Sequence, residues 1–326
     1  MIRLPPFRYL APRSLEEAVA MKAEYGREAM YVAGGTDLFP NMKRRQFEPM
    51  VLIGLRGLKQ LRGISNGRGL TIGAGTTLNE VANHPQVRAQ YPSLARAAGL
   101  VSSPPLRNMG TIGGNLCVDT RCTYYNQSQA WRKALGFCMK KDGDVCWVAL
   151  SSPECLAVSS SDCAPVAISL GAQVRLVGPQ GERMIRADAL YRNDGMQYLK
   201  TWPDEVLVSI HLPPMQGWRT SYLKLRRRGS IDFPILGVAV ALRSEEDGTC
   251  TDARLVLGAV ASQPVSAPEA AALLVGHRIT PELMNEVAEL AARHAKPLDN
   301  TDMGLSFRKK MARVYAARAL AEAAGR

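Results

Sequence analysis

The sequence of 326 residues predicts an α+β fold with two domains. In the first two thirds of the chain, short apolar strands alternate with helices that begin at recognisable capping residues. After Pro213-Pro214 the order changes, and strand-like segments are followed by two amphipathic helices. We therefore place a domain boundary near Gly217, which gives domains at 1–216 and 217–326.

Local signals define the elements of the first domain. Ser14 and Glu17 form an S-x-x-E capping box for a helix that Gly26 ends, and residues 30–33 and 51–54 are short apolar strands. Further along, Thr77 and Glu80 form a second capping box for a helix toward Val87. The other predicted elements are a strand at 70–74 after an Asn-Gly turn, a helix at 93–100, and, among alternating strands and turns from Ala164 onward, strands at 173–177 and 206–212.

The second domain is predicted as strands followed by helices. The strands lie at 221–225, 236–242 and 253–260. One helix starts at Thr280-Pro281-Glu282, a cap followed by a proline and an early acidic residue. The expected buried faces are Leu283, Val287, Leu290 and Ala291 on that helix, and Phe307, Met311, Val314 and Tyr315 on the last.

Charge and hydropathy limit the possible functions. The net charge of +12 indicates an anionic partner, although no nucleic-acid-binding motif is present. No secretory signal opens the sequence, and no apolar run approaches the roughly 20 residues of a membrane span. We expect a cytoplasmic protein with no nucleic-acid or membrane partner; a basic module that binds an anion such as RNA is the non-enzymatic alternative.

Six of the seven cysteines lie between Cys117 and Cys163. In a reducing compartment such crowding indicates metal binding or catalysis more than disulfides. Four of these six are candidate ligands of a metal cluster: Cys122, Cys138, Cys146 and Cys155. Their spacing differs from zinc ribbons and bacterial ferredoxins, yet four cysteines on an extended loop suffice for a [4Fe–4S] cluster. The alternative is a set of buried free thiols.

Two glycine-rich turns could each hold a pyrophosphate. They are Ala33-Gly34-Gly35-Thr36-Asp37 and Thr111-Ile112-Gly113-Gly114-Asn115. Glycine allows close approach of a bulky anion, and threonine and asparagine can donate hydrogen bonds to it. Either turn alone is more simply a tight turn, and neither matches the Rossmann or Walker pattern. Together they favour a nucleotide cofactor.

These turns, with D-x-x-P at 162–165 and Y-x-K at 222–224, resemble the FAD-binding subunits of the molybdenum hydroxylases, the xanthine and carbon monoxide dehydrogenase family. The resemblance implies a two-subdomain FAD domain of the vanillyl-alcohol oxidase/MurB (PCMH) type, at about 1–57 and 58–216. A C-terminal domain of the CO dehydrogenase flavoprotein type would follow it.

The same resemblance implies the roles of single residues. No catalytic residue is expected, because the substrate binds to another subunit. Asp162 would lie near the ribityl or adenosine part of FAD, and Lys224 beside the isoalloxazine. The pyrophosphate would be held by Ala33, Gly34, Gly35, Thr36 and Asp37 on one side and by Thr111, Gly114 and Asn115 on the other.

The sequence departs from the common family pattern by an insertion at about 117–160. Asp162 follows Asn115 after 46 residues, whereas about ten are usual, and the extra segment carries the four cysteines. An insertion with an added cluster resembles the 4-hydroxybenzoyl-CoA reductase branch, which removes a phenolic hydroxyl from an aromatic thioester.

That branch implies several partners. A ferredoxin would donate electrons, and a molybdopterin-binding large subunit and a [2Fe–2S] small subunit would accept them in a dimer of heterotrimers. Five basic residues of the insertion are expected to steer the acidic ferredoxin: Arg121, Arg132, Lys133, Lys140 and Lys141. The alternative is an ordinary hydroxylase subunit that delivers electrons to NAD or a quinone, with the insertion as a zinc-bound or cluster-free docking loop.

Overall fold

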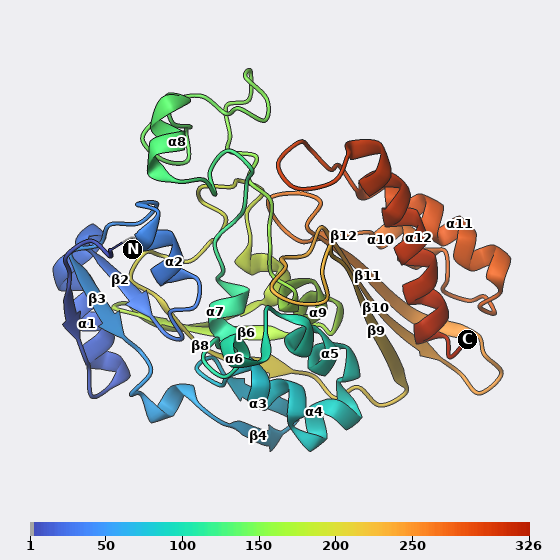
Figure 1. Cartoon of the computed structure of the whole chain (residues 1–326). Helices are drawn as coiled ribbons and strands as arrows, with labels where there is room; N and C mark the ends of the chain where they lie inside the picture. The colour runs from blue at the N-terminus through green and yellow to red at the C-terminus, as the bar shows by residue number, and fades with distance from the viewer. Residues whose placement is uncertain (1–2) are drawn as a thin grey trace.

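The computed structural model describes residues 3–326 and confirms the α+β fold, with three sheets in this part of the chain. Figure 1 shows an N-terminal sheet, a central sheet with helices beneath it, and a C-terminal sheet covered by helices. No helix between residues 3 and 326 is long and apolar enough to cross a membrane.

The N-terminal sheet has three parallel strands in the order β1-β3-β2. The central strand β3 (Val51–Gly54) is buried at every position, as its apolar sequence predicts. Helix α1 (Leu15–Tyr25) starts at Ser14, whose hydroxyl accepts from the Glu17 N–H at 3.1 Å. The flanking elements are β1 (Arg8–Leu10), β2 (Ala29–Val32) and α2 (Leu38–Lys43).

The central sheet has five antiparallel strands in the order β4-β5-β8-β6-β7. Thr77 and Glu80 form the expected capping box, but helix α3 (Leu78–Asn83) ends before Val87 because Pro85 starts a new helix. The strands are β4 (Ile64–Gly67), β5 (Gly69–Gly73), β6 (Gln173–Gly178), β7 (Gly181–Arg186) and β8 (Val206–Leu212). The other helices are α4 (Pro85–Gln90), α5 (Pro92–Leu100), α6 (Pro104–Arg107), α7 (Ile112–Leu116) and α9 (Cys163–Ser169).

Helix α9 replaces the strand or turn expected from Ala164 onward. Its buried residues join the largest apolar core, between α5 and the sheets. The short apolar run was ambiguous between helix and strand, and packing decided it.

The C-terminal sheet is antiparallel, in the order β12-β11-β10-β9; α10 and α12 pack on it, and α11 packs against these two helices. The last helix confirms the predicted face in part, because Met311 and Tyr315 are partly buried and pack against the core. Phe307 is 44% exposed, whereas Ala312, Ala316 and the Arg308 side chain are buried. Small residues let this helix lie close to the sheet. The elements are β9 (Trp218–Leu225), β10 (Leu236–Ser244), β11 (Cys250–Gly258), β12 (Val265–Ser266), α10 (Pro268–Ala272), α11 (Pro281–His294) and α12 (Leu305–Ala323).

The cysteine-rich insertion projects from the central region as a loop with one short helix, α8 (Gln129–Ala134), at the top of Figure 1. Two backbone hydrogen bonds between Arg121 and Val158, of 2.8 and 2.7 Å, hold its two ends together. The loop also contacts both neighbouring regions. Gln46 donates to the Tyr125 carbonyl, and Asn300 donates to that of Leu156, each at 2.6 Å.

Candidate cofactor sites

The two glycine turns lie against one another. A Cβ on Gly34 would stand 2.7 Å from the Met109 carbonyl carbon and 2.9 Å from the Gly110 Cα, both backbone atoms. Gly35 has a φ of +70°, a conformation that favours glycine. Thr36 lies next to the second turn, since its Oγ1 would be 3.3 Å from a Cβ on Gly110. Segments about 75 residues apart in the sequence therefore form one surface.

The second turn is tied to the D-x-x-P segment. Thr111 caps α7 by accepting from the Gly114 N–H at 3.1 Å. The Asn115 amide oxygen accepts from the Ser161 hydroxyl at 2.9 Å and from the Cys163 N–H at 3.1 Å. These bonds occupy the amide oxygen of Asn115, so only its NH₂ group is available as a donor to a ligand.

Asp162 and Lys224 form a buried ion pair of 2.8 Å between the two domains. The Tyr222 hydroxyl donates to the second carboxylate oxygen at 2.8 Å. Burial raises the pKa of Asp162, while Lys224 and Tyr222 oppose that rise. Lys224 also donates to the carbonyls of Leu100 and Asp232, at 3.1 and 2.8 Å. Its ammonium is thus held at the start of the segment that leads into the second glycine turn.

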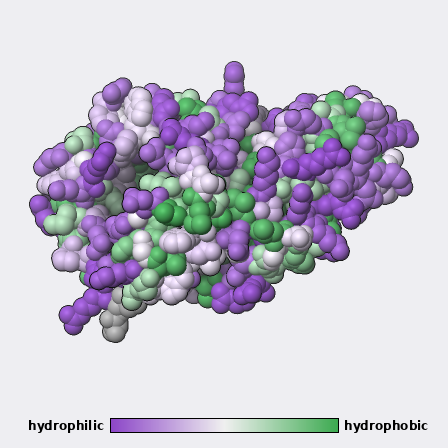
Figure 2. Space-filling view, turned by 90° about the horizontal axis from the view of Figure 1, so that it is seen from above, coloured by the Kyte–Doolittle hydropathy of each residue, from purple (hydrophilic) through white to green (hydrophobic). Residues whose placement is uncertain are grey.

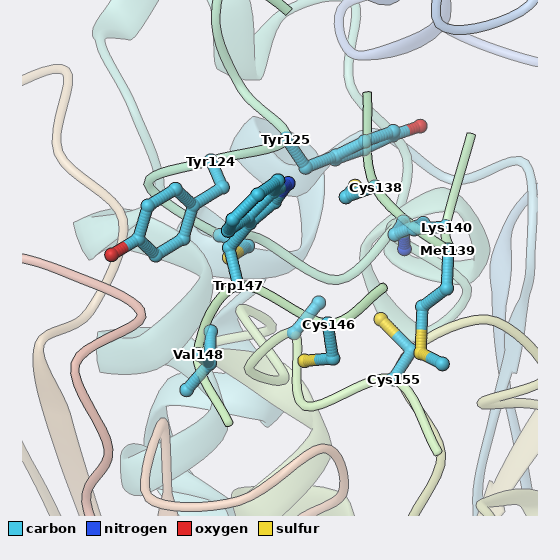
Figure 3. A pocket seen from close by; sticks show the side chains of 11 residues that line it. Tyr124, Tyr125, Cys138, Met139, Lys140, Cys146, Trp147, Val148 and Cys155 are labelled. Carbon is cyan, nitrogen blue, oxygen red and sulfur yellow. The ribbon is translucent and has the colours of Figure 1, made fainter. Parts of the chain in front are cut away.

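The four predicted cysteines of the insertion line one pocket. Figure 3 shows Cys138, Cys146 and Cys155 around this pocket. The rings of Tyr124, Tyr125 and Trp147 also line this pocket. Cys117 and Cys163 are not among its lining residues. The structure therefore brings together the same four thiols that the sequence singles out.

All seven cysteines have free thiols. Burial raises the pKa of Cys122 to about 11 and that of Cys155 to about 12, so both are neutral thiols at pH 7. Among residues 3–326, no three His, Cys, Asp or Glu side chains lie close enough to hold a single metal ion.

The basic residues of the insertion do not form a steering surface, which corrects the sequence prediction. Arg132 is 1% exposed and donates to the carbonyls of Arg44 and Arg45, at 2.7 and 3.1 Å. Lys140 is buried and paired with Asp119 at 2.7 Å. Lys141 pairs with Asp142 at 3.0 Å, so Lys133 is the one exposed cation of the five that has no acidic partner within residues 3–326. Figure 2 shows apolar side chains over the middle of the face seen from above.

Arg121 links the cysteine pocket to the first glycine turn. It precedes Cys122, and its guanidinium forms an ion pair with Asp37 and donates to the Asn41 amide oxygen at 3.2 Å. It also stacks 4.2 Å from the centroid of Phe233, a residue of the C-terminal domain. Burial lowers the pKa of Arg121 to about 10, so it is charged at neutral pH. Sequence reasoning missed this role, because Asp37 and Arg121 lie far apart in the chain.

The facing glycine turns define a protein that binds a nucleotide cofactor. Residues 5–215 match the family of the FAD binding domain in molybdopterin dehydrogenase, and residues 220–323 match the CO dehydrogenase flavoprotein C-terminal domain. The chain belongs to the FAD-binding medium subunits of the molybdenum hydroxylase family, and is a flavoprotein oxidoreductase subunit.

Relatives and solved structures agree with this assignment. The carbon monoxide dehydrogenase medium chain of Hydrogenophaga pseudoflava is 31% identical, over 97% of this chain and 96% of its own length. The aldehyde oxidoreductase FAD-binding subunit of Escherichia coli is 33% identical, over 75% of this chain and 79% of its own. The structure of the Hydrogenophaga enzyme superposes with a TM-score of 0.82 at 30% identity, and covers 99% of this chain and 98% of that one.

Proposed function

We propose that the chain is an electron-transfer subunit that carries FAD and a [4Fe–4S] cluster. The observation that carries this proposal is the convergence of Cys122, Cys138, Cys146 and Cys155 on one pocket. Four cysteine thiolates are the usual ligand set of such a cluster. The pocket lies in an insertion that Arg121 connects to the flavin-binding turn, which suits a direct passage of electrons between the two cofactors.

The residues present fit FAD. The first turn offers backbone N–H groups beside Gly34 and Gly35, and side chains at either position would collide with Met109, Gly110 or Phe39. In this proposal Ala33 to Asp37 hold one side of the pyrophosphate, and Thr111, Gly114 and the Asn115 NH₂ group hold the other. Bound FAD exchanges electrons singly or in pairs, so it can connect one-electron clusters to a two-electron reaction.

The ion pair of Asp162 and Lys224 has a positioning role in this site. Because it is buried, it fixes the C-terminal sheet against the loop that leads to the second glycine turn. We propose that the Lys224 ammonium contributes positive potential near the isoalloxazine. Such a charge stabilises the reduced, anionic flavin.

We further propose that this subunit carries electrons toward the molybdenum centre, in the direction that reduces the substrate. Reduced ferredoxin would supply the cluster, and FAD would pass electrons to [2Fe–2S] and molybdenum centres on two partner subunits, in a cytoplasmic dimer of heterotrimers. The large subunit would remove a phenolic hydroxyl from an aromatic CoA thioester, as in 4-hydroxybenzoyl-CoA reductase. The four-cysteine insertion supports this choice, since the resemblance associates it with that branch.

A second candidate is the flavin subunit of an ordinary hydroxylase, which passes electrons outward to NAD or a quinone. The similarity to the carbon monoxide dehydrogenase medium chain and to an aldehyde oxidoreductase subunit favours it. In that case the insertion is a docking loop, with zinc or with no metal. Elemental analysis separates the two candidates, because zinc in place of iron supports the second.

Single cysteine substitutions test the ligand assignment. We expect Cys138→Ser to lose iron and acid-labile sulfide while FAD stays bound, because the flavin turns do not include this residue. Cys163→Ser and Cys250→Ser are matched controls, since both thiols are buried outside the pocket. Full iron content in Cys138→Ser would contradict the assignment. Loss of iron and FAD together would show that the loop has a structural role in flavin binding.

A further inference from the structure

One lysine lines the pocket of the four cysteines. This residue is Lys140, and its side chain is 5% exposed. Its Nζ donates three hydrogen bonds, to the Asp119 carboxylate at 2.7 Å, to the Gly195 carbonyl at 2.6 Å and to the Thr120 hydroxyl. These bonds use all three donors, so the charge is fixed in position.

The surroundings hold this ammonium next to Cys155. The Gly195 N–H donates to the Cys155 carbonyl at 2.7 Å, and a Cβ on Gly195 would be 2.8 Å from the Cys155 sulfur. The backbone that accepts from Lys140 therefore packs directly on this thiol. The ring centroids of Tyr125 and Tyr198 lie 4.8 and 5.6 Å from Nζ, and their faces favour a cation.

Asp119 forms the other half of a buried dipole. Its side chain is 7% exposed, and its Oδ2 is buried without a hydrogen-bond partner in the described part of the chain. Asp119 is absent from the pocket lining, whereas Lys140 is part of it. Of the two charged residues of this pair, Lys140 is therefore the one in contact with the pocket of cysteines.

We propose that the Lys140–Asp119 pair sets the reduction potential of the cluster, with Lys140 raising the potential and Asp119 moderating it. The inference rests on the proposed function. Reduction brings one electron, and so one negative charge, into a ring of four thiolates. A fixed ammonium beside that ring stabilises the reduced form more than the oxidised form, because Coulomb energy is large where water is excluded. A buried carboxylate has the opposite effect.

Two substitutions with opposite expected signs test this role. In Lys140→Gln the midpoint potential of the cluster falls, and in Asp119→Asn it rises. Lys141→Gln is the matched control, because this neighbour is half-buried and pairs with Asp142; its potential stays unchanged. The measurement is a mediator-controlled reductive titration of the intact protein, followed by the EPR signal of the reduced cluster.

The outcomes separate this proposal from the one on which it depends. If the wild type contains iron but the potential is unchanged in both variants, or shifts with the same sign in both, the role of the pair is wrong and the cluster still stands. Wild type without iron overturns the cluster and this role together. If Lys140→Gln does not retain iron, Asp119→Asn decides, since a carboxylate-to-amide change keeps the shape; an unchanged or lower potential then overturns the proposal.

Discussion

Substitution of Gly34 tests whether the two glycine turns form one flavin site. The Cβ of Gly34→Ala would lie 2.7 Å from the Met109 carbonyl carbon, and closer still to the carbonyl oxygen. Ordinary carbon–carbon contacts are about 3.5–4.0 Å, so the turns must separate by about 1 Å. Both obstacles are backbone, and a side-chain rotation cannot relieve them.

Overpacking of this kind costs about 1–3 kcal/mol. Where this free-energy cost falls on the FAD-bound state, the FAD dissociation constant rises by roughly 5-fold to 150-fold. The assay is a titration of flavin-free protein with FAD, followed by the change in flavin fluorescence. Gly57→Ala is the control, because nothing lies within 4 Å of its Cβ. Wild-type FAD affinity in Gly34→Ala would refute the proposed contact between turns and cofactor.

Two further substitutions test the contacts around the flavin site. Lys224→Met leaves the buried Asp162 carboxylate without its cation and is expected to lower the free energy of unfolding at pH 7 by about 3–5 kcal/mol in urea titrations. Burial raises the pKa of Asp162 and Lys224 opposes that rise, so in the variant Asp162 takes up a proton at a higher pH than in the wild type. The loss of stability relative to wild type should therefore shrink as the pH falls. A loss of stability that does not depend on pH would argue against the ion pair. Arg121→Gln removes the ion pair with Asp37 and is expected to weaken FAD binding about 5-fold, or about 1 kcal/mol, with iron content retained; loss of iron at unchanged FAD affinity would contradict the link.

Elements with local signals were predictable from the sequence. Ser14 and Thr77 cap helices where the sequence places them, because a cap depends on residues three positions away. Strand β3 agrees with its prediction at both ends. On the last helix Met311 and Tyr315 pack on the core as expected, whereas Phe307 is exposed. The buried alanines of this helix were missed, because large apolar residues were preferred.

Contacts between distant segments were not predictable in the same way. The charge of Lys140 suggested an exposed steering group, and its partner Asp119 gave no signal, because their pairing depends on the path of the loop. Arg132 was misassigned for the same reason, as its acceptors are the backbone carbonyls of Arg44 and Arg45. The crowding of cysteines was visible in the sequence, whereas the lining of one pocket by four of them required the fold.

The metal content of the purified protein tests the cluster most directly. Iron, acid-labile sulfide, zinc and FAD are measured on the same sample, and the dithionite-reduced protein is examined by EPR. We expect about four iron and four sulfide for each FAD, with a cluster signal that appears on reduction. Stoichiometric FAD without iron, or with zinc in its place, would contradict the central claim that this flavin subunit carries its own iron–sulfur cluster.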